Sequence, residues 1–495
     1  MEKKSILFFS RLELAFLYGS LHEYLKDHFN ITHVAYSDEE AEVLKTQFGI
    51  LNVIVFKNLT RVNSEIPVGQ ENLQIIDNLL IEQSNGRFNL NSMLQSNRSS
   101  KYIGYENSIQ AAGMYYSTWM DIFKDRHIDF FVHEPVSLMM NQMAAAVCKW
   151  QGGIYTTHIL VQGDKNDYNF LMVDDYNGRP TEINSFNIGL AADSVNSEKK
   201  RILNYLEKFR SSYAVFFSAL GNGAANFKLQ ASLGKAYLKT SVRKIIKPKK
   251  LDAVIDNIEL FIEEDDLNQR RFKNFSKYKS IKYDELNTSL PYYFYPLHLE
   301  PEAVVLYWAD GLYANQVKLI ENIAAQLPPG DFLYVKDHPH LYGYREKADY
   351  DRIQSIPNVK LLRPSISGKQ IIKDCKGVIT LNGTGGFEAL LMNKHVITFG
   401  SVFYGACKRV RHVANIKDLR KEVYDLQHVT YEDDDELYRF VFAFLMSQKK
   451  GFTNFYGAMH KTLKINLQSN GADVAAGLKD FFNNYSDFQA LGDKN

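Results

Sequence analysis

The chain has 495 residues, which is long for a single hydrophobic core, so we expect two domains. Its 58 basic and 57 acidic side chains leave a formal net charge of +1, which gives no overall field that would recruit nucleic acid. Only three cysteines occur, and they are widely spaced. This excludes a disulfide framework and a paired-cysteine metal knuckle, as expected for the reducing cytoplasm.

The apolar run at residues 6–10 predicts a buried first strand rather than a signal peptide. Arg11 and Glu13 interrupt the run too early for a signal-peptide core, and no small-residue cleavage site follows. No other stretch approaches the roughly 20 apolar residues that span a bilayer. We therefore predict a soluble, cytoplasmic protein.

The first half alternates short apolar runs with amphipathic segments, which predicts a parallel sheet with crossover helices. Residues 59–104 are polar and rich in Asn and Ser, so we interpret them as an insertion or a mobile lobe. The expected strands cover residues 6–10, 31–36, 52–56, 129–133 and 154–158, and the expected helices cover residues 14–29, 39–48, 108–123 and 138–149.

All charged residues between 228 and 250 are Lys or Arg, and the acidic run 263–266 follows. We interpret the basic segment as a solvated helix that precedes an interdomain connection. The alternative is a basic amphipathic helix that lies on the anionic inner surface of the membrane or touches an anionic acceptor. The change of domain is expected between about residues 248 and 291.

The second half repeats the strand–helix pattern, which predicts a second doubly wound sheet. The expected strands cover residues 291–297, 332–335, 359–362, 378–381 and 396–399; helices are expected at 317–327, from about 368, from about 386 and at 434–447. We divide the chain into an N-terminal domain (1–250), a connection (251–290), a C-terminal domain (291–465) and a helical segment (466–495).

A glycine-rich turn, Asn382-Gly383-Thr384-Gly385-Gly386, follows a strand and opens a helix. Glycines let the backbone approach an anion, and the N–H groups of a helix start favour negative charge. The turn matches neither the spaced-glycine dinucleotide fingerprint nor the P-loop. The alternative is a tight turn that needs glycine for geometry alone; beside His338 we favour a phosphate.

His338 follows another buried strand, and Pro339 restricts its backbone. An imidazole at this edge of a sheet could donate to a donor phosphate and stabilise its growing charge as the sugar leaves. Lys336 and Arg345 could add positive charge. The alternative for a lone histidine is a structural role.

Three further polar residues are expected at the same edge. His298 and Glu302 follow the first strand of the second half, and Glu388 lies one turn into the helix after the glycines. Glu388 suits the two hydroxyls of a ribose, and the alternative is ordinary acidic placement at a helix start.

For a catalytic carboxylate the first half offers several candidates. Glu134 follows the strand 129–133 and would act as a general base or a nucleophile. Asp174, Asp175 and Asp310 could serve equally, and a surface or turn position is the alternative for each. No cluster of His, Asp and Glu has metal-ligand spacing, so we expect no metal and no cofactor.

The order of several motifs resembles the capsule polysaccharide biosynthesis family, which includes bacterial β-Kdo transferases of the GT-B fold. The resemblance is dense between residues 292 and 410, and Asp337 stands where many members carry Glu. The motifs are Tyr295-Pro296-Leu297-His298, Pro301-Glu302-Ala303, Leu333-Tyr334-Val335-Lys336-Asp337-His338-Pro339, Ile356-Pro357-Asn358-Val359, Asn382-Gly383-Thr384-Gly385-Gly386-Phe387-Glu388-Ala389-Leu390, Phe399-Gly400 and Phe403-Tyr404.

The resemblance implies a cytoplasmic glycosyltransferase of two facing Rossmann-like domains. It implies a CMP-activated, Kdo-like donor whose phosphate is held by His338-Pro339 and the Thr384 turn, and a glycan or glycolipid acceptor on the N-terminal domain. The histidine–proline pair also occurs in bacterial sialyltransferases, which use CMP-sugars. Two alternatives stay open, a polyol-phosphate transferase with a CDP-activated donor and a non-catalytic assembly protein.

Overall fold

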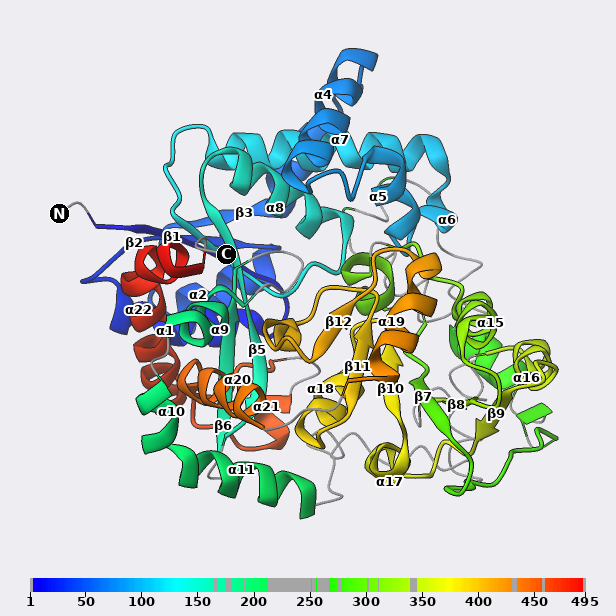
Figure 1. The fold of residues 1–495 in the computed structure, drawn as a ribbon. Coiled ribbons are helices and arrows are strands. Elements are labelled where there is room, and N and C mark those ends of the chain that lie inside the picture. Colours follow the sequence, from blue (N-terminus) through cyan, green and yellow to red (C-terminus); the bar gives the residue numbers. More distant parts are fainter. Residues whose placement is uncertain are drawn as a thin grey trace. The chain divides into compact units, whose positions relative to one another are not determined.

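The computed structural model describes residues 3–163, 167–174, 180–189, 192–211, 251, 255, 267–274, 277–278, 280–300, 302–309, 311–338, 345–429, 434–455 and 459–492 (Figure 1). The predicted basic segment 228–250 and the acidic run 263–266 lie outside these residues. The chain forms two compact units. The first comprises Met1–Ser194, Lys250–Asp256 and Val441–Asn495, and the second comprises Val195–Lys249 and Asn257–Phe440.

The first unit is built on a seven-stranded sheet of order β13-β6-β5-β4-β1-β2-β3. From β5 to β3 all neighbours are parallel, whereas β6 pairs antiparallel with both β5 and β13. The five predicted strands are present, and β6 and β13 were not predicted. The strands are β1 (Ser5–Ser10), β2 (Asn30–Ala35), β3 (Val53–Val55), β4 (Phe130–Val132), β5 (Ile154–Gln162), β6 (Tyr168–Val173) and β13 (Lys449–Lys450).

Helices cover both faces of this sheet, so its central strands are apolar on both sides (Figure 1). Phe8 of β1 packs in the cluster formed with α1 (Leu14–Leu25) and α22 (Leu467–Gly492). The next residue, Phe9, meets Trp119 of α7 (Tyr105–Phe123) edge to face at 5.1 Å between ring centroids. The helices that cover the two faces are α1 (Leu14–Leu25), α2 (Asp38–Phe48), α7 (Tyr105–Phe123), α8 (Met139–Trp150) and α9 (Thr181–Gly189).

Residues 59–104, which we interpreted as an insertion or a mobile lobe, are largely helical, and their helices pack on α7 and α8. The polar residues of this region hid short amphipathic faces, such as Ile76, Leu79 and Leu80 in α4, which are buried. The helices are α3 (Phe56–Ser64), α4 (Gln70–Gln83), α5 (Leu90–Ser96) and α6 (Ser100–Ile103).

The C-terminal part of the chain returns to the first unit, which differs from the predicted domain limit at residue 465. The long helix α22 (Leu467–Gly492) packs against α1 and α9 and buries Phe481 and Phe482 in their core. Between residues 434 and 465 lie α20 (Asp435–Met446) and α21 (Met459–Thr462). Apolar residues far apart in sequence therefore complete a single core.

The second unit contains a six-stranded, all-parallel sheet of order β12-β11-β10-β7-β8-β9. If β7 is counted as the first strand of this sheet and β12 as the sixth, the order from β9 to β12 is 3-2-1-4-5-6. This is the strand order of the Rossmann fold. The predicted α/β class with two Rossmann-type sheets is therefore confirmed. The strands are β7 (Tyr292–Pro296), β8 (Phe332–Lys336), β9 (Val359–Leu362), β10 (Gly377–Thr380), β11 (His395–Thr398) and β12 (Val410–His412).

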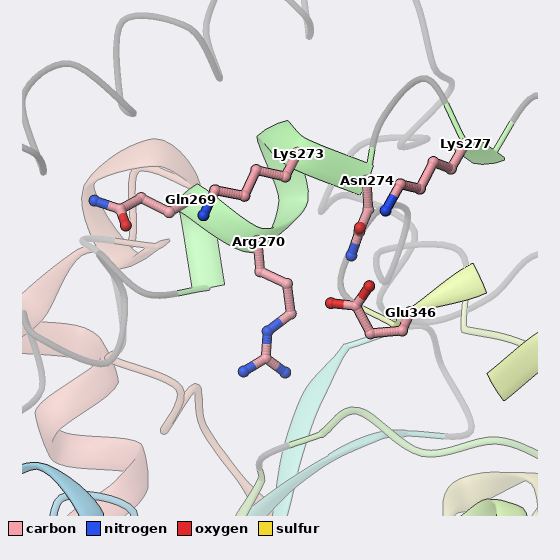
Figure 2. A pocket seen from close by; sticks show the side chains of 6 residues that line it. All are labelled: Gln269, Arg270, Lys273, Asn274, Lys277 and Glu346. Atoms are coloured by element: carbon pink, nitrogen blue, oxygen red, sulfur yellow. The ribbon is translucent and has the colours of Figure 1, made fainter. Parts of the chain in front are cut away.

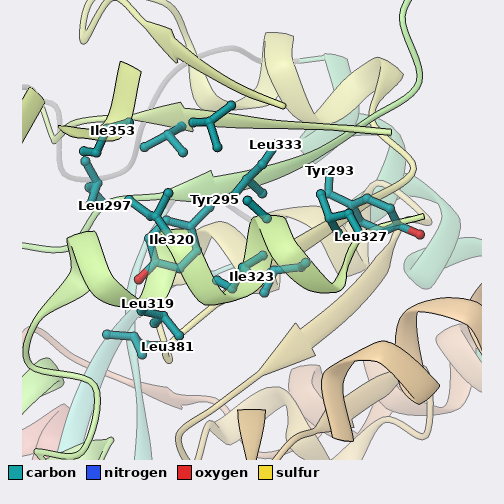
Figure 3. Packing of buried hydrophobic residues seen from close by; sticks show 14 of the residues in the cluster. Tyr293, Tyr295, Leu297, Leu319, Ile320, Ile323, Leu327, Leu333, Ile353 and Leu381 are labelled. Atoms are coloured by element: carbon teal, nitrogen blue, oxygen red, sulfur yellow. The ribbon is translucent and has the colours of Figure 1, made fainter. Parts of the chain in front are cut away.

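One face of the second sheet packs against α15 (Gln316–Gln326), as the helical spacing of its apolar residues predicted. Figure 3 shows Leu319, Ile320 and Ile323 of α15 directed at sheet residues that include Tyr295 and Leu333.

The remaining elements are α10 (Ala192–Ser197), α11 (Lys199–Ser211), η2 (Val304–Trp308), α16 (Lys347–Gln354), α17 (Gly368–Asp374), α18 (Thr384–Leu391), η4 (Phe403–Ala406), η5 (Ile416–Asp418) and α19 (Leu419–Gln427). Within the described ranges, no helix has the length and apolar character needed to cross a bilayer.

Candidate functional site

The loop after β7 occupies the centre of the carboxyl edge of the second sheet. β7 pairs with β10 on one side and β8 on the other, so residues after it lie between the glycine turn and His338. In an open parallel sheet this point, where the strand order reverses, is where ligands bind. The sheet topology thus gathers three of the predicted segments.

His298 lies in this central loop and is only 8% exposed. Its backbone is held by Gln316, which accepts from the His298 N–H (2.8 Å) and donates to its carbonyl (3.1 Å); Arg345 donates to the same carbonyl at 2.8 Å. Burial lowers the pKa of His298 to about 4, so the imidazole is neutral at pH 7. Its Nε2 lies 3.3 Å from Thr380 Oγ1, and its buried Nδ1 has no hydrogen-bond partner among the described residues.

The glycine turn packs directly on this imidazole. A Cβ at Gly383 would lie 2.7 Å from His298 Nε2, and one at Gly386 would collide with the Tyr404 hydroxyl. That hydroxyl donates to the Gly383 carbonyl at 2.7 Å. Close packing therefore accounts for glycine at these two positions. Thr384, the first residue of α18, is exposed, and anion binding by this turn stays a prediction.

Arg345 has a different environment from the one expected. Its buried guanidinium contacts Glu300 at 2.8 Å and Asp337 at 3.5 Å, and it also donates to the His298 carbonyl. Burial lowers the pKa of Arg345, but the two carboxylates outweigh burial and the net direction is upward. Arg345 is a permanent internal cation that joins the loops after β7 and β8, and its charge is neutralised within the protein.

His338 begins the loop after β8 and is half-buried. Its backbone N–H donates to the Asp337 carboxylate at 2.8 Å, and Tyr350 donates to the other oxygen of that carboxylate. Repulsion from His338 is one of the causes that lower the pKa of His298, so the two imidazoles are electrostatic neighbours. Pro339 lies outside the described residues.

Lys336, at the end of β8, lies near Glu388 of α18. Its Nζ donates to the carbonyls of Asp337 (3.4 Å) and Pro364 (3.3 Å). Burial lowers the pKa of Lys336. Burial also raises the pKa of Glu388, whereas the positive charges of Lys369 and Lys336 oppose that rise. These groups form a partly neutralised charge cluster, in which the ribose-binding role of Glu388 stays a prediction.

The remaining predicted residues line the loops rather than an open surface. Asn382 donates to the Val304 carbonyl at 3.0 Å, while its buried Oδ1 has no partner within the described ranges. Gly385 faces Pro296, where an added Cβ would lie 3.2 Å away. The carbonyl of Glu302 accepts the first hydrogen bond of the short helix at 304–308.

In the first unit Glu134 follows β4 and is buried as an ion pair. Its Oε1 accepts from Arg11 (Nε at 3.1 Å and Nη2 at 2.5 Å) and from Asn141 at 3.3 Å, and His133 Nε2 lies 3.5 Å away. Burial raises the pKa of Glu134, but the Arg11 guanidinium and His133 outweigh burial and hold it well below its usual range. A carboxylate that is so strongly favoured as an anion is a weak proton acceptor.

Further polar groups surround this ion pair at the reversal point of the first sheet. Ser10 Oγ, Asn141 Oδ1, both amide atoms of Gln142 and Thr157 Oγ1 are buried and have no hydrogen-bond partner in the described part of the chain. Buried polar atoms usually have a partner, in the protein or in water or ligand. The sequence signal for this site was Arg11 itself, a charged residue that directly follows an apolar strand.

Asp174 has a structural environment. Its carboxylate accepts from the backbone N–H of Thr181 at 3.1 Å, from the Thr181 hydroxyl and from Tyr485 of α22 at 2.7 Å. Burial raises its pKa, and these hydrogen bonds oppose the rise. Asp174 therefore fixes the start of α9 and the docking of α22. Asp175 and Asp310 lie outside the described residues. No group of metal-ligating side chains is found within the residues that the structure covers, and the metal-free mechanism stays a prediction.

Comparison with known proteins finds one family model, described as capsule polysaccharide biosynthesis protein, which matches residues 243–408. Protein FixF of Sinorhizobium fredii is 30% identical over 145 residues, 28% of this chain and 32% of FixF, so the match spans about a third of that relative. Among solved structures, the β-Kdo 2,7 transferase and the β-Kdo 2,4 transferase of Thermosulfurimonas dismutans KpsC are 11% and 14% identical. The alignments cover 70% and 66% of this chain and 89% and 82% of those chains, with TM-scores of 0.30 and 0.29.

Proposed function

We propose that the chain is a glycosyltransferase of surface polysaccharide assembly, because residues 243–408 match the family model of capsule polysaccharide biosynthesis proteins. The finer proposal is transfer of a Kdo-like sugar from a CMP-activated donor to a glycan or glycolipid at the inner face of the membrane. The observation that carries the proposal is the position of His298, a buried imidazole that packs on the glycine turn and follows β7, the strand between β10 and β8. A site of this kind suits a phosphate group at a sheet edge.

The donor phosphate would be bound by neutral and cationic groups together. His338 and the N–H groups of the α18 start would donate to the phosphate oxygens, and Lys336 would add positive charge nearby. His298 stays neutral, so it can supply one hydrogen bond without the desolvation penalty of a buried imidazolium. Stabilisation of the departing CMP by fixed donors is the main catalytic effect expected here.

On the acceptor side Glu134 would act in its ionised form. Its low pKa argues against a general base and suits a nucleophile or a group that stabilises positive charge on the sugar. The unpartnered atoms of Ser10, Gln142 and Thr157 would receive hydroxyl groups of a sugar. Asp174 is left out of this proposal because Thr181 and Tyr485 occupy its carboxylate.

The test is a panel of activated donors, beginning with CMP-Kdo, with products identified by mass spectrometry. His338→Ala is expected to lower kcat by about a hundredfold or more, because one fixed donor to the leaving phosphate is lost. The matched control is His428→Ala, since His428 is an exposed histidine at the end of α19. Equal turnover of both variants would refute the role of His338.

Nucleotide binding and product analysis distinguish the glycosyltransferase from the polyol-phosphate transferase and the non-catalytic assembly protein. CMP should raise the melting temperature of the wild-type protein more than CDP or UDP does, because a ligand that binds only the folded state stabilises it. Transfer of a polyol phosphate from a CDP-polyol donor, which forms a phosphodiester in the product and releases CMP, would replace the sugar-transfer proposal. No stabilisation by any of the three nucleotides would favour a non-catalytic assembly protein.

A further inference from the structure

A separate cavity of about 250 Å³ lies in the second unit, beside the helical segment 267–274 (Figure 2). Figure 2 shows the side chains of that segment on one wall and Glu346, which precedes α16, on another. The described residues that line it are all polar or charged: Gln269, Arg270, Lys273, Asn274, Lys277 and Glu346.

Three of the lining residues, Arg270, Lys273 and Lys277, are cations. Like charges held around one cavity repel one another, and an anion bound among them would reduce that repulsion. Among the described residues, Glu346 is the one acid that lines the cavity. With Arg270, Lys273 and Lys277, this described part of the lining carries three positive charges against one negative, a net of +2. This charge favours an anionic ligand.

The floor of the cavity is connected to the candidate donor site. Asn274 is 2% exposed, and its side-chain amide donates to the Arg345 carbonyl at 3.4 Å. The Arg345 side chain in turn donates to the His298 carbonyl at 2.8 Å and to Glu300. Asn274 and Arg345 thus connect the cavity to the backbone of His298 at the centre of the sheet edge.

A second connection runs through tyrosine hydroxyls. Tyr278, one residue beyond Lys277, forms a hydrogen bond of 2.5 Å with Tyr350 of α16, and Tyr350 donates to Asp337. Asp337 fixes the backbone N–H of His338. A ligand in the cavity would therefore contact the same framework that positions the loop of His338.

We propose that this cavity binds a carboxylate or phosphate group of the sugar chain that the enzyme extends. Arginine and lysine side chains suit such a group, because a guanidinium can form two parallel hydrogen bonds with it and an ammonium group acts as a point charge. None of the described lining residues is aromatic, whereas a nucleotide base usually stacks on a ring. A volume below the roughly 300–1,000 Å³ of drug-sized pockets suits one sugar acid or one phosphate.

The binding of a small anion does not depend on the proposed function, whereas the identification of that anion with the sugar chain does. The binding test titrates the full-length protein with inorganic phosphate and, separately, with glucuronate at low salt, and follows the melting temperature. Lys273→Gln/Lys277→Gln should weaken binding of both by about tenfold, equivalent to the loss of one charge-assisted hydrogen bond. Lys318→Gln/Lys421→Gln is the matched control, because it removes two exposed lysines of the same unit.

Glu346→Gln is expected to change the anion affinity in the opposite direction. It removes the acid from the lining while keeping an oxygen for the start of α16, so the apparent affinity for both anions should rise several-fold. A purely structural role of the cluster would give no such gain. Equal anion binding by wild type, the cavity double variant and Glu346→Gln would overturn the proposal.

The activity test identifies the source of the anion. In the double variant the KM for an acidic glycan acceptor should rise, while the KM for the nucleotide donor and for a neutral acceptor should stay unchanged. Normal transfer with an unchanged acceptor KM would refute the sugar-chain ligand and leave the glycosyltransferase proposal intact. Anion binding that depends on the cavity lysines, without transfer from any donor, would refute the proposed function alone.

Discussion

The two sheets each carry buried polar groups at the edge where the strand order reverses, but the two clusters are satisfied in different ways. At the first sheet Glu134 and Arg11 are both charged and neutralise each other at 2.5 Å. At the second sheet the central group is the neutral imidazole of His298, whose Nδ1 has no partner among the described residues. The charged group at the first edge therefore has its counter-ion within the protein, whereas the central group at the second edge is neutral.

The largest effect is expected from breaking the ion pair. Glu134→Ala leaves the Arg11 guanidinium buried without its carboxylate, which should lower the free energy of unfolding by about 3–5 kcal/mol. Urea unfolding monitored by circular dichroism measures the loss. Glu134→Leu combined with Arg11→Met should recover much of it, and equal stability of Glu134→Ala and wild type would contradict the ion-pair description.

The second prediction concerns the pH dependence that His298 contributes. Its pKa is about 4 in the folded protein and near 6.5 when unfolded, so the unfolded chain binds more protons between these values. The stabilising contribution is complete above pH 6.5, is lost as the pH falls towards 4, and reaches at most about 3 kcal/mol.

His298→Gln tests this dependence, because glutamine keeps a polar amide but does not titrate. The difference in unfolding free energy between wild type and His298→Gln should shift in favour of the variant as the pH falls from 6.5 to 4. Two parallel curves over this range would show that His298 is not held neutral by burial.

The smallest effect is expected at the glycine turn. Gly383→Ala places a methyl group against His298 Nε2 and should destabilise the fold by about 1–3 kcal/mol. It should also reduce the thermal shift produced by CMP, because the imidazole and the turn must separate. Gly405→Ala is the control, since its Cβ would meet Val402 at an ordinary 3.5 Å. A full nucleotide response in Gly383→Ala would remove the turn from the binding site.

Much of the fold could be predicted from the sequence because the signal was local. Apolar runs of strand length predicted the central strands of both sheets, and the helical spacing of apolar residues at 317–327 predicted α15. The glycine turn and the residues after β7 and β8 could be placed at one edge, because the carboxyl ends of parallel strands share an edge. The resemblance to capsule polysaccharide biosynthesis proteins was carried by these same local motifs.

The tertiary structure alone decided which polar groups neutralise one another. Arg345 was expected to add positive charge for a phosphate, but it forms ion pairs with Asp337 and Glu300. Asp174 was a candidate catalytic carboxylate, but it accepts a hydrogen bond from Tyr485 of α22. The return of α22 to the first unit has the same origin, because its phenylalanines match an apolar face formed by residues hundreds of positions away. A sequence states the chemistry of each side chain, but the partner of a buried charge is set by packing between distant segments, and the partner determines the pKa and the role.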